Sequence, residues 1–329
     1  MCDDQECHHL RGPRCCNDLL QNGFVSSGQR SLGGKVLIAI DWGTSNFRAF
    51  RLDAAGQIVE RRLFPSGVLR VEDGRFAETL LAQVGDWLKD GESRILLCGM
   101  VGSRQGWAEA KYLSCPVGIE DLAKSVIELP FDGAEVLLIP GVIGEDSYGI
   151  PEVMRGEETE AMGMLDSCSG AGLVCLPGTH SKWIHLKNRK IVSFITCMTG
   201  EVFAVLRKCT ILARIMTSDV EVNVEPFLRG VARSKDSGGL LHHLFSVRTL
   251  ALVDQLKEED SASYLSGLLI GHEVRAAMPS GTHVHLVGAA QLCALYGQAI
   301  EVCGGSFTLE DQDAAARGLA AIARRLSWT

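Results

Sequence analysis

The alternation of apolar and polar residues predicts strands and helices in mixed order through the first half of the chain. Residues 36–40 (VLIAI) form a continuous apolar run, which is typical of a strand buried on both faces. Apolar residues recur at helical spacing from Phe76 to Leu88, so we expect an amphipathic helix with one face in a core. Strands are also predicted at residues 46–52, 57–63, 95–98 and 135–139, and the helix is expected to bury Phe76, Leu80, Leu81, Val84, Trp87 and Leu88. Together these elements predict an α/β layer arrangement.

The second half shows a similar order of elements. An apolar run at residues 172–176 is followed by a glycine-containing turn. Residues 308–311 (TLED) have the form of a capping box, so we expect a final alanine-rich helix directly after them. The remaining predictions are strands at 182–186, 191–196 and 283–287, helices at 201–214, 240–256 and 262–277, and a helix after Gly288-Ala289-Ala290.

The two halves align with an offset of 135 positions (179 − 44 = 135), which sets Thr179 against Thr44. In both copies a buried strand meets Gly-Thr and turns into a second strand that contains a basic residue. The repeat predicts two similar α/β domains, at residues 35–168 and 169–329, which face one another across a cleft where a ligand would bind. We place the last helix at the domain interface, where it can pack back on the first domain.

Composition limits the classes of function. The 329 residues include 32 Lys and Arg against 40 Asp and Glu, and this acidic balance argues against a dedicated nucleic-acid binder. Hydrophobic residues make up 46% and charged residues 22%, as in a globular protein. No run approaches the roughly 18 apolar residues of a membrane span, and no apolar secretory segment follows Met1. We therefore expect a soluble cytoplasmic protein, whose cysteines after residue 34 are reduced core thiols.

Residues 1–34 differ from the rest of the chain because cysteine and histidine crowd a polar segment. Both residue types are zinc ligands, but no Cys-x-x-Cys pair is present, so we expect a poorly ordered extension rather than a metal site. His242 and His243 have no acid or Cys at ligand spacing and are expected at the surface. The cysteines and histidines within residues 1–34 are Cys2, Cys7, His8, His9, Cys15 and Cys16.

The turn after the first strand carries the most informative residues. Gly43 lets the backbone approach a ligand closely, and the amides and hydroxyls of Thr44 and Ser45 can donate to phosphate oxygens. Asp41, at the end of the buried strand, is placed to hold Mg²⁺ directly or through water. An ordinary hairpin turn with Asp as a turn residue would use the same residues, so the segment alone leaves both interpretations open.

Taken with Gly178-Thr179, this hairpin resembles the two phosphate-binding loops of the actin–hexokinase–Hsp70 ATPase superfamily. The resemblance narrows to the 2-dehydro-3-deoxygalactonokinase family, because segments that look like its signatures occur in the expected order from residue 38 to about 297. These segments are residues 99–107 (GMVGSRQGW), 154–159 (MRGEET), 177–183 (PGTHSKW) and 198–203 (MTGEVF). The resemblance implies two actin-like, ribonuclease-H-like α/β domains and the activity of a sugar-acid kinase.

That resemblance implies transfer of the γ-phosphoryl group of ATP, with Mg²⁺, to O6 of 2-dehydro-3-deoxy-D-galactonate in galactonate catabolism. Such a transfer needs a nucleotide cradle, a metal, positive charge and a group that positions the attacking hydroxyl. Arg48 and Lys182 could supply the charge or be solvated strand residues. Gly288-Ala289 resembles the adenosine-binding segment, although close helix–strand packing explains small residues almost equally well. The expected ATP- and phosphate-binding residues are Gly43, Thr44, Ser45, Arg48, Gly178, Thr179, Lys182, Gly288 and Ala289.

The second loop departs from many members of the superfamily, because Leu176 and Pro177 stand where an acidic residue is common. Asp41 is then the only carboxylate in either loop core, so the metal role falls on it and the catalytic base is open. Glu157 and Glu158 follow a glycine at a predicted helix start, where the helix dipole favours acids and where capping alone would explain them. A related phosphatase branch carries a catalytic Glu in a similar segment. We therefore expect Glu157 or Glu158 to position or deprotonate the sugar hydroxyl.

The glycine-rich segment at residues 99–107 is expected to bind the sugar acid. Arg104 suits a planar carboxylate bidentately, although a surface Arg in a turn is the other interpretation. His180 could contact the substrate or a phosphate, or be structural. The expected substrate-binding residues are Gly102, Ser103, Arg104, Trp107 and His180.

Two other classes of function stay open from the sequence. An exopolyphosphatase-like phosphohydrolase is suggested by Gly156-Glu157-Glu158, but it would be expected to carry an acidic Asp-x-Gly-Gly second loop, which is absent. A nucleotide-binding regulator without activity would be expected to lack Asp41. The sequence does not separate 2-dehydro-3-deoxy-D-galactonate from other 2-keto-3-deoxy sugar acids. The expected partners are the sugar acid and MgATP, without nucleic acid or membrane. A homodimer is left open, because the sequence does not reveal the oligomeric state.

Overall fold

The first of two large sheets has the strand order β3-β2-β1-β4-β7-β6 in the computed structural model, which describes residues 36–216 and 221–328. Antiparallel strands β1, β2 and β3 form a meander, β1 pairs in parallel with β4, and β4 pairs in parallel with β7. The Cys- and His-containing segment of residues 1–34 lies outside the described residues. The strands are β1 (Leu37–Trp42), β2 (Phe47–Leu52), β3 (Ile58–Phe64), β4 (Arg94–Cys98), β6 (Ile127–Leu129) and β7 (Glu135–Leu138).

The second large sheet has the order β12-β11-β10-β13-β14. It repeats the first sheet, because an antiparallel meander of three strands is again extended in parallel from its first strand. The predicted repeat is therefore confirmed at the level of topology, whereas the boundary at residues 168 and 169 stays a prediction. Residues 35–329 form one compact unit. The strands are β10 (Gly172–Leu176), β11 (Ser181–Lys187), β12 (Lys190–Cys197), β13 (His283–Leu286) and β14 (Ser306–Leu309), and a small third sheet holds β5 (Leu113–Ser114), β8 (Val142–Glu145) and β9 (Pro151–Met154).

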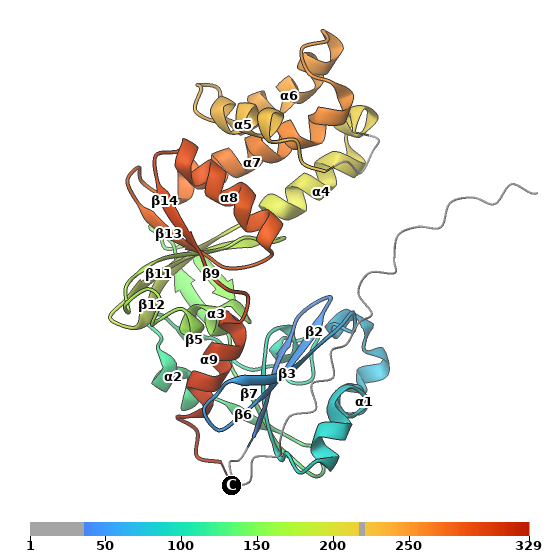
Figure 1. Cartoon of the computed structure of the whole chain (residues 1–329), viewed down its shortest axis with the longest axis vertical. Helices are drawn as coiled ribbons and strands as arrows, with labels where there is room; N and C mark the ends of the chain where they lie inside the picture. The colour runs from blue at the N-terminus through green and yellow to red at the C-terminus, as the bar shows by residue number, and fades with distance from the viewer. Residues whose placement is uncertain (1–35, 217–220, 329) are drawn as a thin grey trace, which may run out of the picture. The chain divides into compact units, whose positions relative to one another are not determined.

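Helices cover the sheets and join them. Helix α1 covers one face of the first sheet, where Val84 and Trp87 pack in one core with Ile38 and Ile40 (Figure 1). The opposite face of β1 belongs to a core that also contains residues of β10, so β1 is buried on both faces as predicted. None of the described helices is long and apolar enough to cross a membrane. The helices are α1 (Phe76–Lys89), α2 (Ile119–Ala123), α3 (Glu157–Gly163), α4 (Thr199–Cys209), α5 (Val224–Arg233), α6 (Gly239–Leu252), α7 (Ser261–Ala277), α8 (Ala290–Val302) and α9 (Ala314–Ala323).

Several local predictions are wrong. Residues 308–311 do not cap a helix, because Thr308 pairs with His285 in the parallel ladder of β13 and β14 and the last helix begins only at Ala314. Leu81 is 53% exposed on α1 rather than in the core. His243 is fully buried, where it contacts the His272 ring across α6 and α7, so only its neighbour His242 is exposed. Among the described cysteines, Cys209 is exposed and is not a core thiol.

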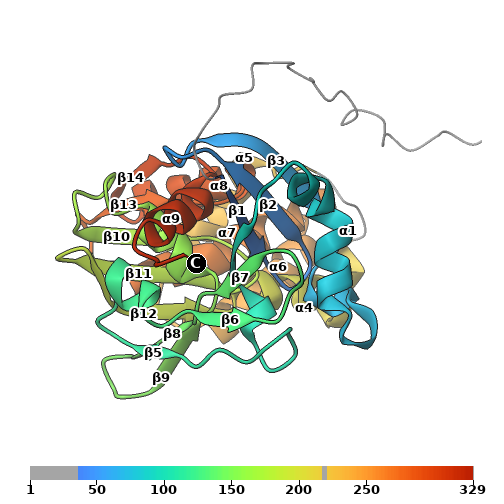
Figure 2. The same cartoon turned by 90° about the horizontal axis from the view of Figure 1, so that it is seen from below.

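Helix α9 packs on α3 and on strands β1 and β4, and its position beside β1 can be followed in Figure 2. The contact with α3 depends on glycine: a Cβ atom at Gly318 would lie 1.9 Å from the carbonyl oxygen of Thr159, and one at Gly163 would lie 1.9 Å from that of Ala314. Backbone meets backbone at both points, so neither neighbour can rotate away. This contact fixes α3, whose first turn carries Glu157 and Glu158.

Replacing Gly318 with alanine is expected to lower the free energy of unfolding by about 1–3 kcal/mol, because the added methyl group overpacks the contact between α3 and α9. Denaturant unfolding measures this change. The same substitution at Gly85 in α1 is a matched control, because its nearest neighbour is the flexible, exposed side chain of Leu81. There alanine should stabilise the helix by up to about 1 kcal/mol. Equal effects at the two glycines would contradict this account of the α3–α9 contact.

Candidate functional site

The segment that follows β3 supports the backbone of the first predicted loop, residues 43–45. The amides of Gly67 and Val68 donate to the carbonyl oxygens of Ser45 and Gly43, at 3.1 and 3.0 Å. A Cβ atom at Gly67 would lie 2.3 Å from the carbonyl oxygen of Thr44, so only glycine permits this approach. Thr44 and Ser45 remain exposed. The loop is therefore rigid in its backbone and open to solvent at its side chains, which suits a phosphate cradle.

Asp41 is the penultimate residue of β1 and lies opposite Arg48 in the antiparallel pairing of β1 with β2. An Arg48 Nη2 atom lies 2.6 Å from Asp41 Oδ2, and Arg48 also reaches Glu160 of α3 at 3.7 Å. Asp41 is 6% exposed, and burial raises the pKa of its carboxyl group while the Arg48 charge opposes that rise. Arg48 is thus the counter-charge of the strand-end carboxylate, and its side chain is 44% exposed toward solvent.

Two glycines let other strand ends approach Asp41. A Cβ atom at Gly99, just after β4, would lie 3.0 Å from Asp41 Oδ1 and 2.8 Å from the carbonyl oxygen of Trp42. A Cβ atom at Gly156, just after β9, would lie 3.2 Å from the Cα of Gly99. Both glycines have positive φ angles, of 93° and 112°. The turns after β1, β4 and β9 therefore meet at one point, which brings the predicted loop and the predicted acid pair together.

The acid pair at the start of α3 divides into two different environments. The Glu157 side chain is 28% exposed, and its Oε1 lies 3.3 Å from Lys182 Nζ. The Glu157 charge contributes to the raised pKa of Asp41. Glu158 is fully buried, and its oxygens accept hydrogen bonds from the amide of Gly156 at 2.6 Å and the hydroxyl of Thr159 at 3.3 Å. Burial, with the neighbouring Glu157 charge, raises the pKa of Glu158 to about 8. Only Glu157 of the pair can meet a ligand without rearrangement.

Glu160 is a third acid of this site that the sequence analysis did not single out. Burial raises its pKa to about 8, and the Asp41 charge adds to that rise. It lies on α3 one turn after Glu157, so the i, i+3 spacing of two acids was the available signal. Its carboxyl group shares Arg48 with Asp41.

Lys182 in β11 takes the structural position of Arg48. It lies opposite Leu176, the last residue of β10, as Arg48 lies opposite Asp41. The second turn is one residue shorter than the first (182 − 176 = 6 against 48 − 41 = 7), so the fixed offset of 135 fails after the Gly-Thr pair. Lys182 is 5% exposed and its ammonium group pairs with Glu157, so the solvated alternative is wrong for this residue.

The second loop, residues 178–180, contacts the start of α4 and is otherwise mostly exposed. A Cβ atom at Gly178 would meet nothing within 4 Å, and Thr179 and His180 are exposed. A Cβ atom at Gly200, in the first turn of α4, would lie 2.5 Å from the carbonyl oxygen of Gly178. The His180 ring nitrogen Nε2 contacts a carboxylate oxygen of Glu201. The loop is therefore packed on the start of α4 and free on its other side.

The residues expected to bind a sugar acid lie in different surroundings. Arg104 is exposed and its Nε donates to Glu109 at 3.0 Å. The Trp107 ring stacks on Phe76 with centroids 6.3 Å apart and packs against the first core. Gly102 is buried against the Arg155 guanidinium, since a Cβ atom there would lie 2.9 Å from Arg155 Nη1.

Arg155, which precedes the acid pair, links this loop to the start of α3. It is 8% exposed, its Nη2 donates to the carbonyl oxygen of Ala110 at 2.7 Å, and its guanidinium lies 4.4 Å from the centroid of the Tyr112 ring. Its backbone amide donates to Glu157 Oε2 at 3.0 Å. The buried Ser103 hydroxyl makes no hydrogen bond within the described part of the chain. Loop 99–112 and Glu157 are therefore held in one unit.

An apolar cavity of about 250 Å³ opens beside the second loop. Its walls come from α4, α7 and α8, and Gly178 lies at its edge. Gly288 has a φ of 146° and lies close to the carbonyl oxygen of Pro177, while Ala289 is exposed at the start of α8. The lining includes Gly178, Thr199, Phe203, Leu292, Leu295 and Tyr296. The cavity suits a flat, mainly apolar group attached to a phosphate chain.

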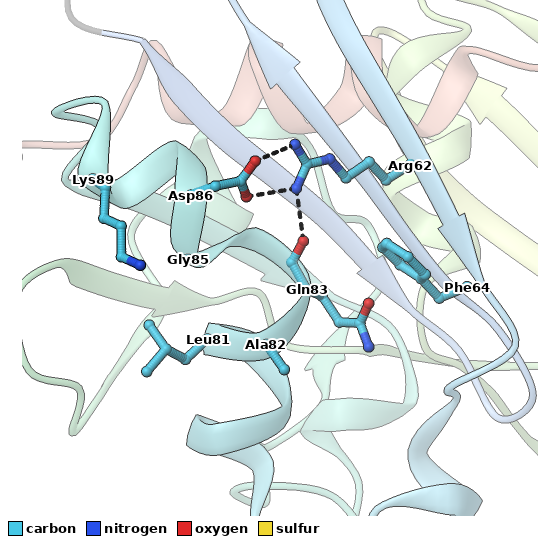
Figure 3. Close-up of a pocket in the computed structure, with 8 residues that line it drawn as sticks. All are labelled: Arg62, Phe64, Leu81, Ala82, Gln83, Gly85, Asp86 and Lys89. Atoms are coloured by element: carbon cyan, nitrogen blue, oxygen red, sulfur yellow. Dashed lines mark hydrogen bonds and ion pairs between the residues drawn. The ribbon is translucent and has the colours of Figure 1, made fainter. Parts of the chain in front are cut away.

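A larger cavity, of about 570 Å³, lies between β3 and α1 (Figure 3). Arg62 dominates it, but both terminal nitrogens of Arg62 already donate to Asp86, at 2.7 and 2.6 Å, and its guanidinium lies over the Trp87 ring. The hydrogen bonds from Arg62, together with its charge, lower the pKa of Asp86 to about 2. None of the predicted site residues lines this cavity, and its arginine is satisfied within the protein, so we do not place the site there.

Metal binding at this site would depend on Asp41 together with substrate oxygens. Within residues 36–216 and 221–328, no group of three or more His, Cys, Asp or Glu side chains is arranged to hold a metal ion. Mg²⁺ nevertheless commonly binds one or two carboxylates together with substrate phosphate oxygens. Asp41 suits that requirement by its chemistry, since its Oδ2 pairs with Arg48 and the turns beside its Oδ1 carry glycine at positions 99 and 156.

Comparison with known proteins gives one consistent result. A family model described as 2-keto-3-deoxy-galactonokinase matches residues 41–322. The chain is 34% identical over 296 residues to a probable 2-dehydro-3-deoxygalactonokinase of Rhizobium meliloti (strain 1021), and the aligned region covers 88% of this chain and 96% of that protein. It is also 34% identical over 284 residues to the 2-dehydro-3-deoxygalactonokinase of Escherichia coli (strain K12), which covers 84% of this chain and 94% of that protein.

Solved structures agree with the fold. A crystal structure of a protein from Sinorhizobium meliloti assigned as a 2-dehydro-3-deoxygalactonokinase has a TM-score of 0.81 at 33% identity, covering 88% of this chain and 98% of that one. An activator of 2-hydroxyisocaproyl-CoA dehydratase from Clostridium difficile with bound ADPNP has a TM-score of 0.50 at 14% identity, covering 88% and 95% of the two chains. The predicted actin-like α/β fold is thereby confirmed.

Proposed function

The chain belongs to the 2-keto-3-deoxy-galactonokinase family, and from this premise we propose that it transfers the γ-phosphoryl group of ATP to the terminal O6 hydroxyl of 2-dehydro-3-deoxy-D-galactonate. The observation that supports this activity most directly is the meeting of three charged groups from separate elements. Lys182 of the second hairpin pairs with Glu157, and the Glu157 charge contributes to the raised pKa of Asp41 in the first hairpin. Phosphoryl transfer requires this combination of a strand-end carboxylate, a cation and an acid that can orient a hydroxyl.

Each side chain then has a distinct task. Glu157 accepts a hydrogen bond from the O6 hydroxyl and takes its proton during transfer. Lys182 and Arg48 provide positive charge at the transferred phosphoryl group, and the amides and hydroxyls of both Gly-Thr loops hold the phosphates. Glu158 shapes the turn through its hydrogen bond from Gly156.

The nucleotide is placed by the second loop and the apolar cavity. With the phosphates at Gly178 and Thr179, the adenine base lies in the cavity between α4 and α8, where burial of a flat ring is favourable. Asp41 would hold Mg²⁺, which would neutralise phosphate charge when bound. The sugar acid lies against loop 99–107 on the side of Glu157.

Identification of the product tests the proposed reaction. Wild-type protein incubated with MgATP and 2-dehydro-3-deoxy-D-galactonate should form a monophosphate whose phosphorus couples to the C6 protons in NMR spectra. Its C4 epimer is the matched comparison substrate, and we expect a lower kcat/KM for it. A phosphate at another carbon, or a higher kcat/KM for the epimer, would contradict the proposed substrate.

Replacing Arg104 with alanine is expected to raise the KM for the sugar acid about tenfold and leave the KM for ATP within about twofold. The reason is that an exposed guanidinium at the loop can pair with the substrate carboxylate in exchange for its surface pair with Glu109. Steady-state kinetics with each substrate varied in turn measure both constants. Glu109→Gln is the control, because it frees Arg104 without removing it. An equal rise in both KM values for Arg104→Ala would remove Arg104 from the substrate site.

A further inference from the structure

A buried carboxylate lies beneath the second loop. Glu273 of α7 is 5% exposed. Its Oε1 accepts a hydrogen bond from Trp183 Nε1 at 2.8 Å, and its Oε2 accepts one from the Tyr296 hydroxyl at 2.7 Å. The Thr199 hydroxyl donates to the same carboxylate, and the Ser181 hydroxyl lies 3.5 Å from Oε2 and 2.8 Å from the Tyr296 oxygen. Burial raises the pKa of Glu273, and these hydrogen bonds oppose that rise.

These hydroxyl groups come from three elements that surround the nucleotide site. Ser181 begins β11 directly after the second loop, Thr199 begins α4, and Tyr296 lies in α8. Thr199 and Tyr296 also line the apolar cavity, together with Gly178 of the loop. One carboxylate on a fourth element, α7, therefore ties together the loop, the helix start packed on it and the far wall of the cavity.

The carboxylate also fixes the direction of the hydroxyl groups. An ionised carboxylate only accepts hydrogen bonds, and the indole nitrogen of Trp183 only donates, so Oε1 is committed to Trp183. The hydroxyl hydrogens of Thr199 and Tyr296 then point to the carboxylate and away from the cavity. The Tyr296 oxygen already accepts from the Ser181 hydroxyl, 2.8 Å away. The lone pairs of the half-buried Thr199 remain for the cavity side, so Thr199 acts as an acceptor toward a ligand.

We propose that Glu273 is a positioning residue of the nucleotide site, which fixes the second loop against α4 and α8 and sets Thr199 as a hydrogen-bond acceptor for a donor group of the nucleotide. Glu273 acts through these neighbours and does not touch the nucleotide. The inference rests on the proposed function in one respect, which is that the ligand is an adenine nucleotide.

The test measures ADP binding directly, without the sugar acid. Glutamine at position 273 keeps the shape of the side chain, but its amide group must donate where the carboxylate accepted, so a hydroxyl has to turn toward the cavity. Isothermal titration calorimetry with MgADP is expected to show a Kd at least about tenfold higher for Glu273→Gln than for wild type. The KM for the sugar acid should stay within about twofold.

Matched variants separate positioning from stability. Glu92, 7% exposed and paired with Arg51, is a buried carboxylate of the first half, and Glu92→Gln should lower the melting temperature without changing the Kd for ADP. Thr199→Ser keeps the donor to Glu273 and should retain ADP affinity, whereas Thr199→Val should lose it. These two variants also decide the matter if Glu273→Gln does not fold.

Three outcomes would overturn the inference. The first is a folded Glu273→Gln variant with wild-type affinity for ADP. The second is a rise in the KM for the sugar acid that equals the rise in the Kd for ADP. Thr199→Ser and Thr199→Val with equal ADP affinity would contradict it independently of Glu273. Wild-type protein that binds no ADP would instead contradict the proposed function itself, so the two failures can be told apart.

Discussion

Replacing Asp41 with asparagine is expected to lower kcat by about 10²- to 10⁴-fold, because the loss removes several kcal/mol of charge stabilisation from the site of phosphoryl transfer. Asparagine has nearly the same shape, but it neither neutralises Arg48 nor offers Mg²⁺ an anionic oxygen. Steady-state turnover at saturating MgATP and sugar acid measures the effect.

The control for Asp41 is another aspartate paired with an arginine. Asp90 lies 3.2 Å from Arg51 and is exposed, so Asp90→Asn should change kcat less than twofold. Asp41→Asn should also keep a melting temperature within a few degrees of wild type, since the pair with Arg48 is partly exposed. Turnover of Asp41→Asn within tenfold of wild type would show that the strand-end carboxylate does not act in the reaction.

The two glutamates at the start of α3 should respond very differently to substitution. Glu157→Gln is expected to lower kcat by about 10²- to 10⁴-fold, the usual range for loss of a general base. Glu158→Gln should retain turnover within a few-fold, because its oxygens are engaged by Gly156 and Thr159 and glutamine can still accept the Gly156 hydrogen bond. Parallel kcat and melting-temperature measurements on both variants make the comparison.

The reverse ranking of these variants would transfer the role of base to Glu158. If alanine at both positions together left turnover within a few-fold of wild type, the assignment of the base to this pair would be wrong. Glu160→Gln adds a further comparison, because Glu160 shares Arg48 with Asp41 but does not contact Lys182 in any ion pair within the described residues.

The sequence was sufficient for the strands and loops that local pattern determines. The continuous apolar run of β1 has the pattern of a strand buried on both faces, and Gly-Thr after each central strand marks the two loops. The repeated order of the strands also followed from the alignment of the halves. These features depend on neighbours in sequence, which a single sequence contains.

Features that depend on long-range packing could not be predicted. Glu157 and Glu158 cannot be distinguished in sequence, yet the packing of α3 on α9, β11 and β12 leaves Glu158 buried and Glu157 partly exposed. The buried position of His243 depends on α7, and the role of Glu273 depends on hydroxyl groups that are 23 to 92 residues away. The exposed loop residue Arg104 was easy to single out, whereas Arg155, held by a carbonyl oxygen and an aromatic ring, carried no local signal.

The most direct test of the kinase assignment is ADP release by the wild-type protein, measured in a coupled assay across a panel of 2-keto-3-deoxy sugar acids. The account predicts ADP formation that requires a sugar acid, is fastest with 2-dehydro-3-deoxy-D-galactonate and is abolished when Mg²⁺ is removed. ATP hydrolysis at the same rate without any acceptor, or no ADP formation with any acid of the panel, would contradict it.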